Sequence, residues 1–255
     1  MLNPICCPLV LSTVKNAFFT VERVNGQQIG LSKLGSGYEM IFSLIYSFYL
    51  AKQGGKDLII LIDEPELHLH PKLQEKFVEL LLEFSKESQV ILTSHSPLLV
   101  KQLLENDFVK TYVLRKNSDG QIVSSETFGL VLPYLSANEI NFVAFDLATE
   151  EYHNELYNEL ENNFWSNNDF RQIKRDNGYP NSTSKQVVFD NEFFVKEKGE
   201  NKNSPWKGNQ NMVSLHTFVR NQIHHRAENG KPDYNNLKSS IEKMREFLQS
   251  LSNQN

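Results

Sequence analysis

The chain has 255 residues, of which 40% are hydrophobic and 22% charged, a balance that fits a globular protein with one sizeable core or one domain and a small appendage. The net charge of −5 argues against bulk electrostatic attraction to nucleic acid, although a local basic patch stays open. The two cysteines, Cys6 and Cys7, are adjacent and form no disulfide framework, as is usual for cytoplasmic proteins.

The sequence shows neither a signal peptide nor a membrane span. The longest strongly apolar run covers residues 40–51, which is too short to cross a bilayer, and the N-terminus has no positively charged n-region. We therefore expect a cytoplasmic protein without membrane association.

The first part of the chain predicts alternating strands and helices. Residues 18–24 alternate weakly and predict a strand that ends in a turn at Asn25-Gly26. Residues 37–53 predict a mostly buried helix, which Gly54-Gly55 ends. The apolar run 58–63 predicts a buried strand, and the helical periodicity of residues 71–86 begins at a proline suited to a first turn.

The next elements continue this alternation. Residues 89–94 predict a second buried strand, and Pro97 begins another short helix. Residues 110–116 and 121–128 flank Asp119-Gly120, which is a hairpin signature. We therefore expect residues 1–135 to form an α/β core with parallel strands.

The composition changes after this core. We expect an acidic helical segment at 136–164 and a polar, poorly packed linker at 165–210. Residues 211–255 predict a C-terminal helical pair at about 211–228 and 234–252, interrupted near Gly230 and Pro232.

Two adjacent carboxylates, Asp63 and Glu64, end the run LIILIDEP at residues 58–65. In phosphoryl-transfer enzymes one carboxylate at the end of a buried strand holds Mg²⁺, and the next polarises the attacking water. A helix cap or a pair of surface charges is the alternative interpretation. His68 and His70 follow as an H-x-H pair, but two histidines and one carboxylate would make an incomplete zinc site.

Two further motifs flank this strand. Gly35, Ser36 and Gly37 lie in LSKLGSGYEM at residues 31–40, where glycines and a helix N-terminus offer donors to a phosphate. A plain glycine turn is the alternative. His95 lies in ILTSHSP, directly after the second buried strand, and its alternative role is to cap the helix that begins at Pro97.

In this order, the three motifs resemble the signature, Walker B and H-loop motifs of AAA-type ATPases of the ABC/OLD-like branch, over about residues 18–130. The segment DEPELHLHP is similar to its counterpart in OLD-type and RecF-like ATPases. The resemblance implies an α/β fold: a partial ABC-type P-loop NTPase head, with a parallel sheet and flanking helices, plus a helical C-terminal extension.

The resemblance also implies ATP and Mg²⁺ as cofactors and a role for each site residue. Asp63 would hold Mg²⁺, Glu64 would be the general base, and His95 would sense the γ-phosphate. Gly35, Ser36 and Gly37 would act on the nucleotide of an opposing head, so that ATP joins two heads in a homodimer.

The partner motif of such a site is missing. A P-loop needs G-x-x-x-x-G-K-[ST], and no stretch of the sequence fits it. Three explanations stay open: a truncated product, which we favour, a split ATPase whose complementary N-terminal half is another chain, or a degenerate partner that donates only its signature loop. We expect the isolated chain to hydrolyse ATP very poorly.

The family resemblance suggests a bacterial defence (anti-phage) or DNA-associated switch, with an effector protein or a nucleic acid as a candidate partner. The rival from another class is a non-hydrolysing interaction module.

The C-terminal segment carries a separate motif. Arg220, Asn221 and His225 match the R-N-x-x-x-H pattern of HEPN-type ribonucleases, in which a histidine would move the 2′-hydroxyl proton and an arginine would stabilise the phosphorane. On a continuous helix, positions 220 and 225 lie about 140° apart, so the helix would need to kink or meet a second copy. An appendage that packs on the ATPase head or binds a partner is the alternative.

Overall fold

The computed structural model describes residues 9–15, 18–23, 28–30, 33, 35–54, 57–125, 128–206 and 211–252. The chain forms two compact units, Met1–Thr111 and Tyr112–Asn255. The predictions for Cys6-Cys7 and for the turn at Asn25-Gly26 lie outside the described residues. No helix in the described ranges combines the length and the apolar character that a bilayer crossing requires.

The N-terminal unit begins with an antiparallel sheet in the order β1-β2-β3. Its strands are β1 (Leu9–Lys15), β2 (Phe18–Arg23) and β3 (Gln28–Gly30). β2 confirms the strand predicted for residues 18–24.

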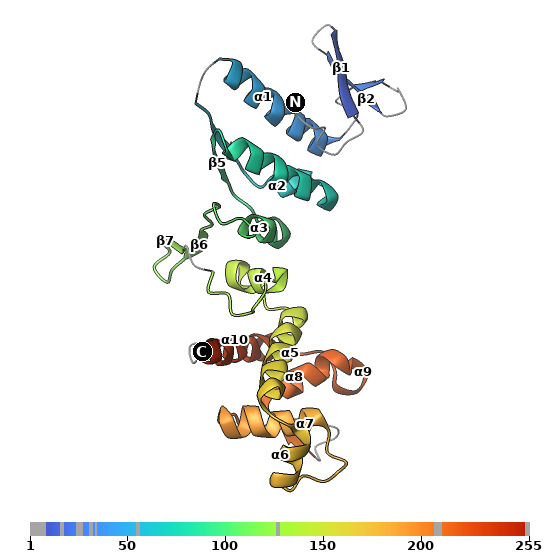
Figure 1. The fold of residues 1–255 in the computed structure, drawn as a ribbon, viewed down its shortest axis with the longest axis vertical. Helices are drawn as coiled ribbons and strands as arrows, with labels where there is room; N and C mark the ends of the chain where they lie inside the picture. The colour runs from blue at the N-terminus through green and yellow to red at the C-terminus, as the bar shows by residue number, and fades with distance from the viewer. Residues whose placement is uncertain are drawn as a thin grey trace. The chain divides into compact units, whose positions relative to one another are not determined.

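The α/β part of this unit follows, and its strands run parallel. Its elements are α1 (Ser36–Gln53), β4 (Ile59–Ile62), the 3-10 helix η2 (Pro65–His68), α2 (Pro71–Ser85), β5 (Gln89–Leu92) and α3 (Pro97–Leu104). β4 and β5 pair in parallel register from Ile59↔Gln89 to Ile62↔Leu92, as the sequence predicts. Figure 1 shows α1 and α2 side by side next to this pair.

One face of the β4–β5 pair packs against α1 and α2. Ile60 lies in a cluster with Leu80 and Phe84 of α2, and the rings of Phe84 and Phe48 stack with their centroids 4.0 Å apart. Full burial of side chains of this size stabilises a fold by about 1.5–3 kcal/mol each. This packing fixes the direction of both strands and therefore the place of their carboxyl ends.

The other face of the same strands is exposed. Ile59, Leu61 and Ile91 are 62%, 73% and 49% exposed. Strands of parallel sheets are usually covered on both faces, and their continuous apolar sequence reflects this. Among the described residues the sheet has two strands, so the outer edges of β4 and β5 carry no further strand.

The C-terminal unit begins with the predicted hairpin. β6 (Val113–Lys116) and β7 (Ile122–Ser125) pair in antiparallel register around a turn in which Gly120 has a φ of 76°. The rest of the unit is mainly helical: α4 (Ala137–Phe145), α5 (Glu150–Asn167), α6 (Phe170–Asp176), α7 (Lys185–Phe189), the π-helix η3 (Asp190–Glu197), β8 (Ser204–Trp206), β9 (Asn211–Val213), α8 (Leu215–His224), α9 (Arg226–Asn229) and α10 (Tyr234–Ser252).

Residues 165–206, the described part of the predicted linker 165–210, are packed more closely than their composition predicts. This range contains α6, α7 and η3, and Phe189, Phe193 and Phe194 are buried in the core of the unit with Tyr157 of α5. These aromatic side chains are buried although polar residues surround them in the sequence, because α5, α8 and α10 supply an apolar surface against which they pack. The boundary after Thr111 falls inside the predicted domain 1–135, and the predicted division into four segments stays a prediction.

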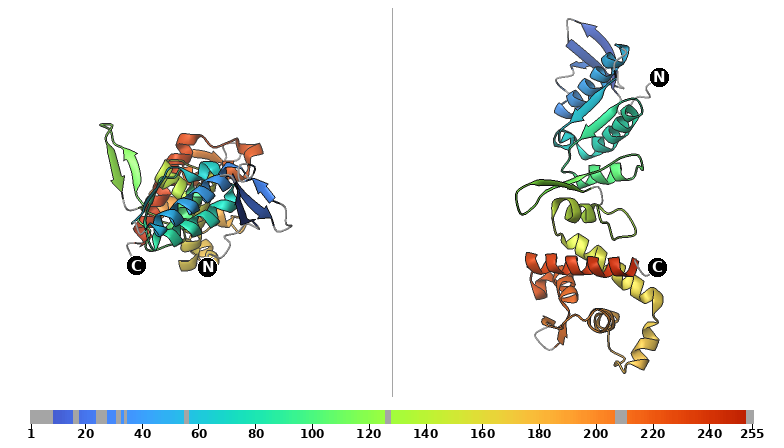
Figure 2. Two further views of the ribbon diagram at one scale, coloured as in Figure 1. Left: turned by 90° about the horizontal axis from the view of Figure 1, so that it is seen from above. Right: turned by 90° about the vertical axis from the view of Figure 1, so that its left-hand side faces the viewer.

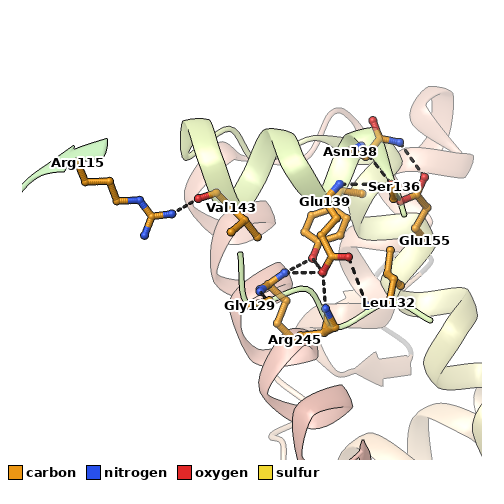
Figure 3. Close-up of polar contacts among 11 residues, drawn as sticks. Arg115, Gly129, Leu132, Ser136, Asn138, Glu139, Val143, Glu155 and Arg245 are labelled. Carbon is orange, nitrogen blue, oxygen red and sulfur yellow. Dashed lines mark hydrogen bonds and ion pairs between the residues drawn. The ribbon is translucent and has the colours of Figure 1, made fainter. Parts of the chain in front are cut away.

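A buried ionic network joins the loop before α4 to three helices (Figure 3). The fully buried carboxylate of Glu139 accepts hydrogen bonds from Val131 N at 2.7 Å, from the Tyr152 hydroxyl at 3.0 Å and from Arg245 Nη1 at 2.9 Å. Arg245 Nη2 also donates to the carbonyl of Gly129 at 2.6 Å. Burial, followed by the charge of Glu139, raises the pKa of Tyr152, so this hydroxyl stays protonated as a donor.

Two buried histidines share one hydroxyl where α10 packs against α5 and α8 (Figures 1 and 2). Ser240 Oγ lies 2.9 Å from His153 Nε2 and 2.8 Å from His216 Nδ1. The hydroxyl has one hydrogen, so it donates to one ring and accepts from the other. Burial lowers the pKa of His216 to about 3 and lowers the pKa of His153 well below its ordinary value, so both rings are neutral at pH 7.

Candidate functional site

The predicted acidic pair lies at the carboxyl edge of the parallel sheet, which we define as residues 63–66 after β4 and 93–96 after β5. Thr93 N donates to the Ile62 carbonyl at 3.0 Å, and Glu64 N donates to the Thr93 carbonyl at 3.2 Å, so the ladder continues one step past the strands. The Thr93 hydroxyl donates to Asp63 Oδ1. These bonds hold Asp63 and Glu64 beside Thr93, at the carboxyl end of β5.

The structure brings Glu64 and His95 together at this edge. His95 Nε2 lies 3.2 Å from Glu64 Oε1, although the two residues are 31 positions apart in the sequence. The imidazole is 75% exposed and the carboxylate 33% exposed, so the pair adds little to stability. It does place a carboxylate and a ring nitrogen side by side at a surface that a phosphate can reach.

Glu64 has an unusual backbone conformation. Its φ of 42° and ψ of 57° lie in the left-handed region, which only one other non-glycine residue, Asp146, occupies in the described part of the chain. Such a conformation costs about 1–3 kcal/mol and is concentrated at functional sites. Here it turns the chain from β4 into η2, whose first residue is Pro65.

Glu66 is a member of this edge that our sequence reasoning did not single out. Its Oε1 accepts hydrogen bonds from His95 N at 2.5 Å and from the Ser94 hydroxyl at 3.0 Å. Its Oε2 is buried and has no hydrogen-bond partner among the described residues. The second glutamate of DEPE was visible in the sequence, but its contact with a segment 29 residues away was not.

The oxygen atoms of this edge fit a magnesium ion. Mg²⁺ prefers oxygen ligands and is usually held by one or two carboxylates together with the phosphates of a substrate. Asp63 is exposed, and its Oδ1 is fixed by Thr93. Asp63, with Glu64 beside it, is therefore the residue that would hold Mg²⁺ here.

The three residues of the predicted signature loop differ in their surroundings. Gly35 is exposed with a φ of 95°, and Ser36 is exposed as the first residue of α1. Gly37 is buried, and a Cβ atom added to it would lie 2.3 Å from the His68 carbonyl oxygen. Packing of α1 on η2 therefore explains the glycine at position 37, whereas Gly35 and Ser36 stay accessible.

The H-x-H pair does not form a metal site in the structure. His70 caps α2, because its Nδ1 accepts from Lys72 N at 3.3 Å, and His68 is exposed in η2. Within the described ranges, no group of three or more histidine, cysteine or acidic side chains is placed to hold a metal ion.

The residues of R-N-x-x-x-H lie at the C-terminal end of α8. The helix ends at His224, and His225 has a non-helical φ of −128° while its N–H donates to the Asn221 carbonyl at 2.8 Å. The spacing expected for a continuous helix therefore does not apply to His225. The Arg220 guanidinium lies 5.3 Å from the centre of the Tyr157 ring, and burial, followed by the charges of Arg220 and His225, lowers the pKa of His224.

Two parallel strands flanked by helices, with acidic side chains beyond the carboxyl end of β4, form an α/β unit that is consistent with a partial P-loop NTPase head. Comparison with known proteins agrees with this class. Residues 9–100 match the family described as AAA ATPase domain.

Two curated proteins and one solved structure are similar to parts of the chain. The Septu protein PtuA of Bacillus thuringiensis is 31% identical over 111 residues, which cover 38% of this chain and 28% of that protein. The OLD nuclease of Thermus scotoductus is 35% identical over 74 residues, which cover 28% of this chain and 13% of that nuclease. A structure from work on ATP-driven dimerization and DNA-stimulated activation of SMC ATPases is 16% identical with a TM-score of 0.40, and the match covers 48% of this chain and 76% of that one.

Residues 9–100 therefore match an AAA ATPase domain, and the similarity to PtuA and to the OLD nuclease fits an ABC/OLD-like family of such ATPases. An ATPase family implies nucleotide binding, which is typically Mg²⁺-dependent. The chain spans only 28% and 13% of the length of the two curated relatives.

Proposed function

We propose that this chain supplies the hydrolytic edge of an ATPase that uses ATP and Mg²⁺. The observation that carries the proposal is the pairing of Glu64 with His95, 3.2 Å apart at the carboxyl edge. Glu64 takes a proton from the attacking water, and His95 contacts the γ-phosphate. Asp63 would hold Mg²⁺, which would supply positive charge to neutralise the phosphates.

The proposal requires a phosphate-binding loop from elsewhere, since the sequence contains no G-x-x-x-x-G-K-[ST]. Such a loop connects a strand to a helix, so the complementary half would add a strand and a helix to the sheet. The uncovered face of the β4–β5 pair supports this assignment: Ile59, Leu61 and Ile91 are exposed there, and both outer strand edges are open among the described residues.

A second contact of the proposal joins two heads. Gly35 and Ser36 are exposed at the N-terminus of α1, whose first backbone N–H groups offer donors to an anion. We assign them to the nucleotide of an opposing head in a homodimer. Gly37 contributes by allowing α1 to approach η2.

Calorimetric titration with ATP and Mg²⁺ tests this assignment. We expect weak binding by the full chain alone and at least tenfold tighter binding after it is mixed with a polypeptide from the same genomic locus that carries a P-loop. Lys56→Ala alters the G-G-K stretch that does not fit a P-loop, so it is the matched control and leaves the affinity unchanged. Equal affinities with and without the P-loop polypeptide would refute the complementation.

We also propose a cytoplasmic role in bacterial anti-phage defence or as a DNA-associated switch, acting through an effector protein or a nucleic acid. The similarity to the Septu protein PtuA and to an OLD nuclease supports this role. Plaque counts on cells that express the complete locus test it. Glu64→Gln should abolish protection that the unaltered locus confers, and protection that survives this change would contradict an ATP-driven role.

Cleavage of RNA is the second candidate function. The helix that carries R-N-x-x-x-H lies in the compact unit of residues 112–255. Arg220 lies near enough to His224 to lower its pKa, and His225 follows directly. These positions place an arginine and two histidines at one end of α8.

An RNA cleavage assay with total RNA and tRNA tests the second function. Arg220→Ala and His225→Ala should each remove cleavage, whereas Lys238→Ala, which alters an exposed ion pair with Asp146, should not. If no RNA is cleaved in the presence of ATP and the P-loop half, the ribonuclease function is wrong. A complemented protein that binds ATP without hydrolysing it would support the rival function, a non-hydrolysing interaction module.

A further inference from the structure

The segment after β5 has to hold His95 in place without regular secondary structure. Residues 93–96 separate β5 from α3, and their side chains and N–H groups are tied to three neighbouring elements. Thr93 is bonded to Asp63 and Glu64, and Ser96 caps α3 through Leu99 N at 3.3 Å. The part between these anchors is Ser94-His95, and both of these residues donate to Glu66.

Glu66 is well suited to fix that part. One carboxylate oxygen receives two donors, the His95 N–H at 2.5 Å and the Ser94 hydroxyl at 3.0 Å. Hydrogen bonds to an ionised acceptor are shorter and stronger than neutral ones. Glu66 itself lies in η2, one residue after Pro65, so its backbone is tied to the turn that carries Glu64.

The two bonds therefore connect the Glu64 turn and the His95 segment without using the side chains of Glu64 and His95. If the Ser94-His95 backbone moved, the imidazole would lose its 3.2 Å separation from Glu64. Effects of this kind matter for catalysis because a displacement of about 1 Å can reduce a rate by about 100-fold.

We propose that Glu66 is a positioning residue, which holds the backbone of Ser94 and His95 so that the His95 imidazole stays beside Glu64. This inference rests on the proposed function of Glu64 and His95, but the geometry that it concerns exists without nucleotide. It can therefore be tested on the full chain alone.

The test is nitrogen-15 NMR of the full chain, with two measurements at His95. The first is the exchange rate of the backbone amide, and the second is the change in the imidazole nitrogen shifts when Glu64→Gln is introduced. In the unaltered background this second change reports that the ring senses Glu64. A role limited to global stability would move melting temperatures but would not uncouple His95 from Glu64.

Three variants give the comparison. Glu66→Ala should raise the exchange rate of the His95 amide by about tenfold and remove the response of the imidazole to Glu64→Gln. Glu66→Gln keeps an amide oxygen for both donors and should retain most of the response. Glu79→Ala is the matched control, because Glu79 is an exposed glutamate of α2 that pairs with Lys76.

An unchanged imidazole response in Glu66→Ala would overturn the inference. Loss of the response in both Glu66→Ala and Glu79→Ala would overturn it too, since the effect would then be general. The outcome is separate from that of the proposed function. ATP titrations with the P-loop half can fail while His95 still depends on Glu66, and they can succeed while it does not.

Discussion

Acid should unfold the C-terminal unit through its two buried histidines. His216 has a folded pKa of about 3, lowered by burial and then by the charge of Lys243, whereas an unfolded histidine has a pKa near 6.5. Protons therefore bind the unfolded state more tightly. The stability that this group contributes is present above pH 6.5 and is lost as the pH falls toward 3.

The size of the effect follows from the two pKa values. Between pH 8 and pH 5, protonation of His216 in the unfolded chain should reduce the free energy of unfolding by about 2 kcal/mol. His153 has its pKa lowered by burial and by the nearby charges of His216, Arg220 and His224, so it adds a loss of the same sign. Glu200 lies 3.9 Å from His216 Nε2, too far to offset the cost of burying a charged ring.

Tryptophan fluorescence during urea unfolding measures this loss in one unit. Both tryptophans of the chain, Trp165 and Trp206, belong to residues 112–255, so their signal reports the C-terminal unit. We expect the free energy of unfolding to fall by at least about 2 kcal/mol between pH 8 and pH 5, with His216→Gln removing about 2 kcal/mol of the fall. His225→Gln, at an exposed position, is the control and should leave the pH dependence unchanged.

The comparison between variants separates the histidines from carboxylates that also titrate near pH 5. An equal fall in the unaltered chain and in His216→Gln would refute the reasoning. A free energy of unfolding that is constant from pH 8 to pH 5 would refute it as well.

Two further predictions concern packing and buried charge. Gly37→Ala should destabilise the N-terminal unit by about 1–3 kcal/mol, because the new Cβ would lie 2.3 Å from the His68 carbonyl oxygen. A melting temperature within about 1 °C of that of the unaltered chain would contradict this. Arg245→Met should cost the C-terminal unit about 3–5 kcal/mol by leaving Glu139 charged and buried, and unfolding by urea followed by tryptophan fluorescence measures it. Arg245→Met combined with Glu139→Gln should recover part of that loss, and a double variant less stable than the single one would exclude this cause.

Local sequence signals predicted much of the N-terminal unit and the hairpin that begins the C-terminal unit. The apolar runs at β4 and β5, the proline that begins α2 and the Asp-Gly turn between β6 and β7 each act within a few residues, and each element forms where it is expected. The parallel pairing of β4 with β5 then follows, because a helix connects them. Strand order alone brings Glu64 and His95 to one edge.

The features of the fold and the site that the sequence did not predict depend on contacts between distant residues. Phe189 and Phe193 lie in a segment of polar composition, and only the surface supplied by α5 and its neighbours shows that they are buried. The sequence does not distinguish Glu66 from the other acidic residues, because its contact with His95 depends on the position of η2 in the fold. The end of α8 at His224 also depends on local backbone geometry that the R-N-x-x-x-H spacing does not reveal.

The central claim is that Asp63, Glu64 and His95 hydrolyse ATP once a phosphate-binding loop is supplied. Phosphate release by the chain mixed with the P-loop half, at saturating ATP and Mg²⁺, measures this most directly. The account predicts that Glu64→Gln lowers the rate by about 100-fold or more while ATP affinity is kept, since a general base contributes at least that much. Equal rates in the Glu64→Gln and unaltered proteins would contradict it.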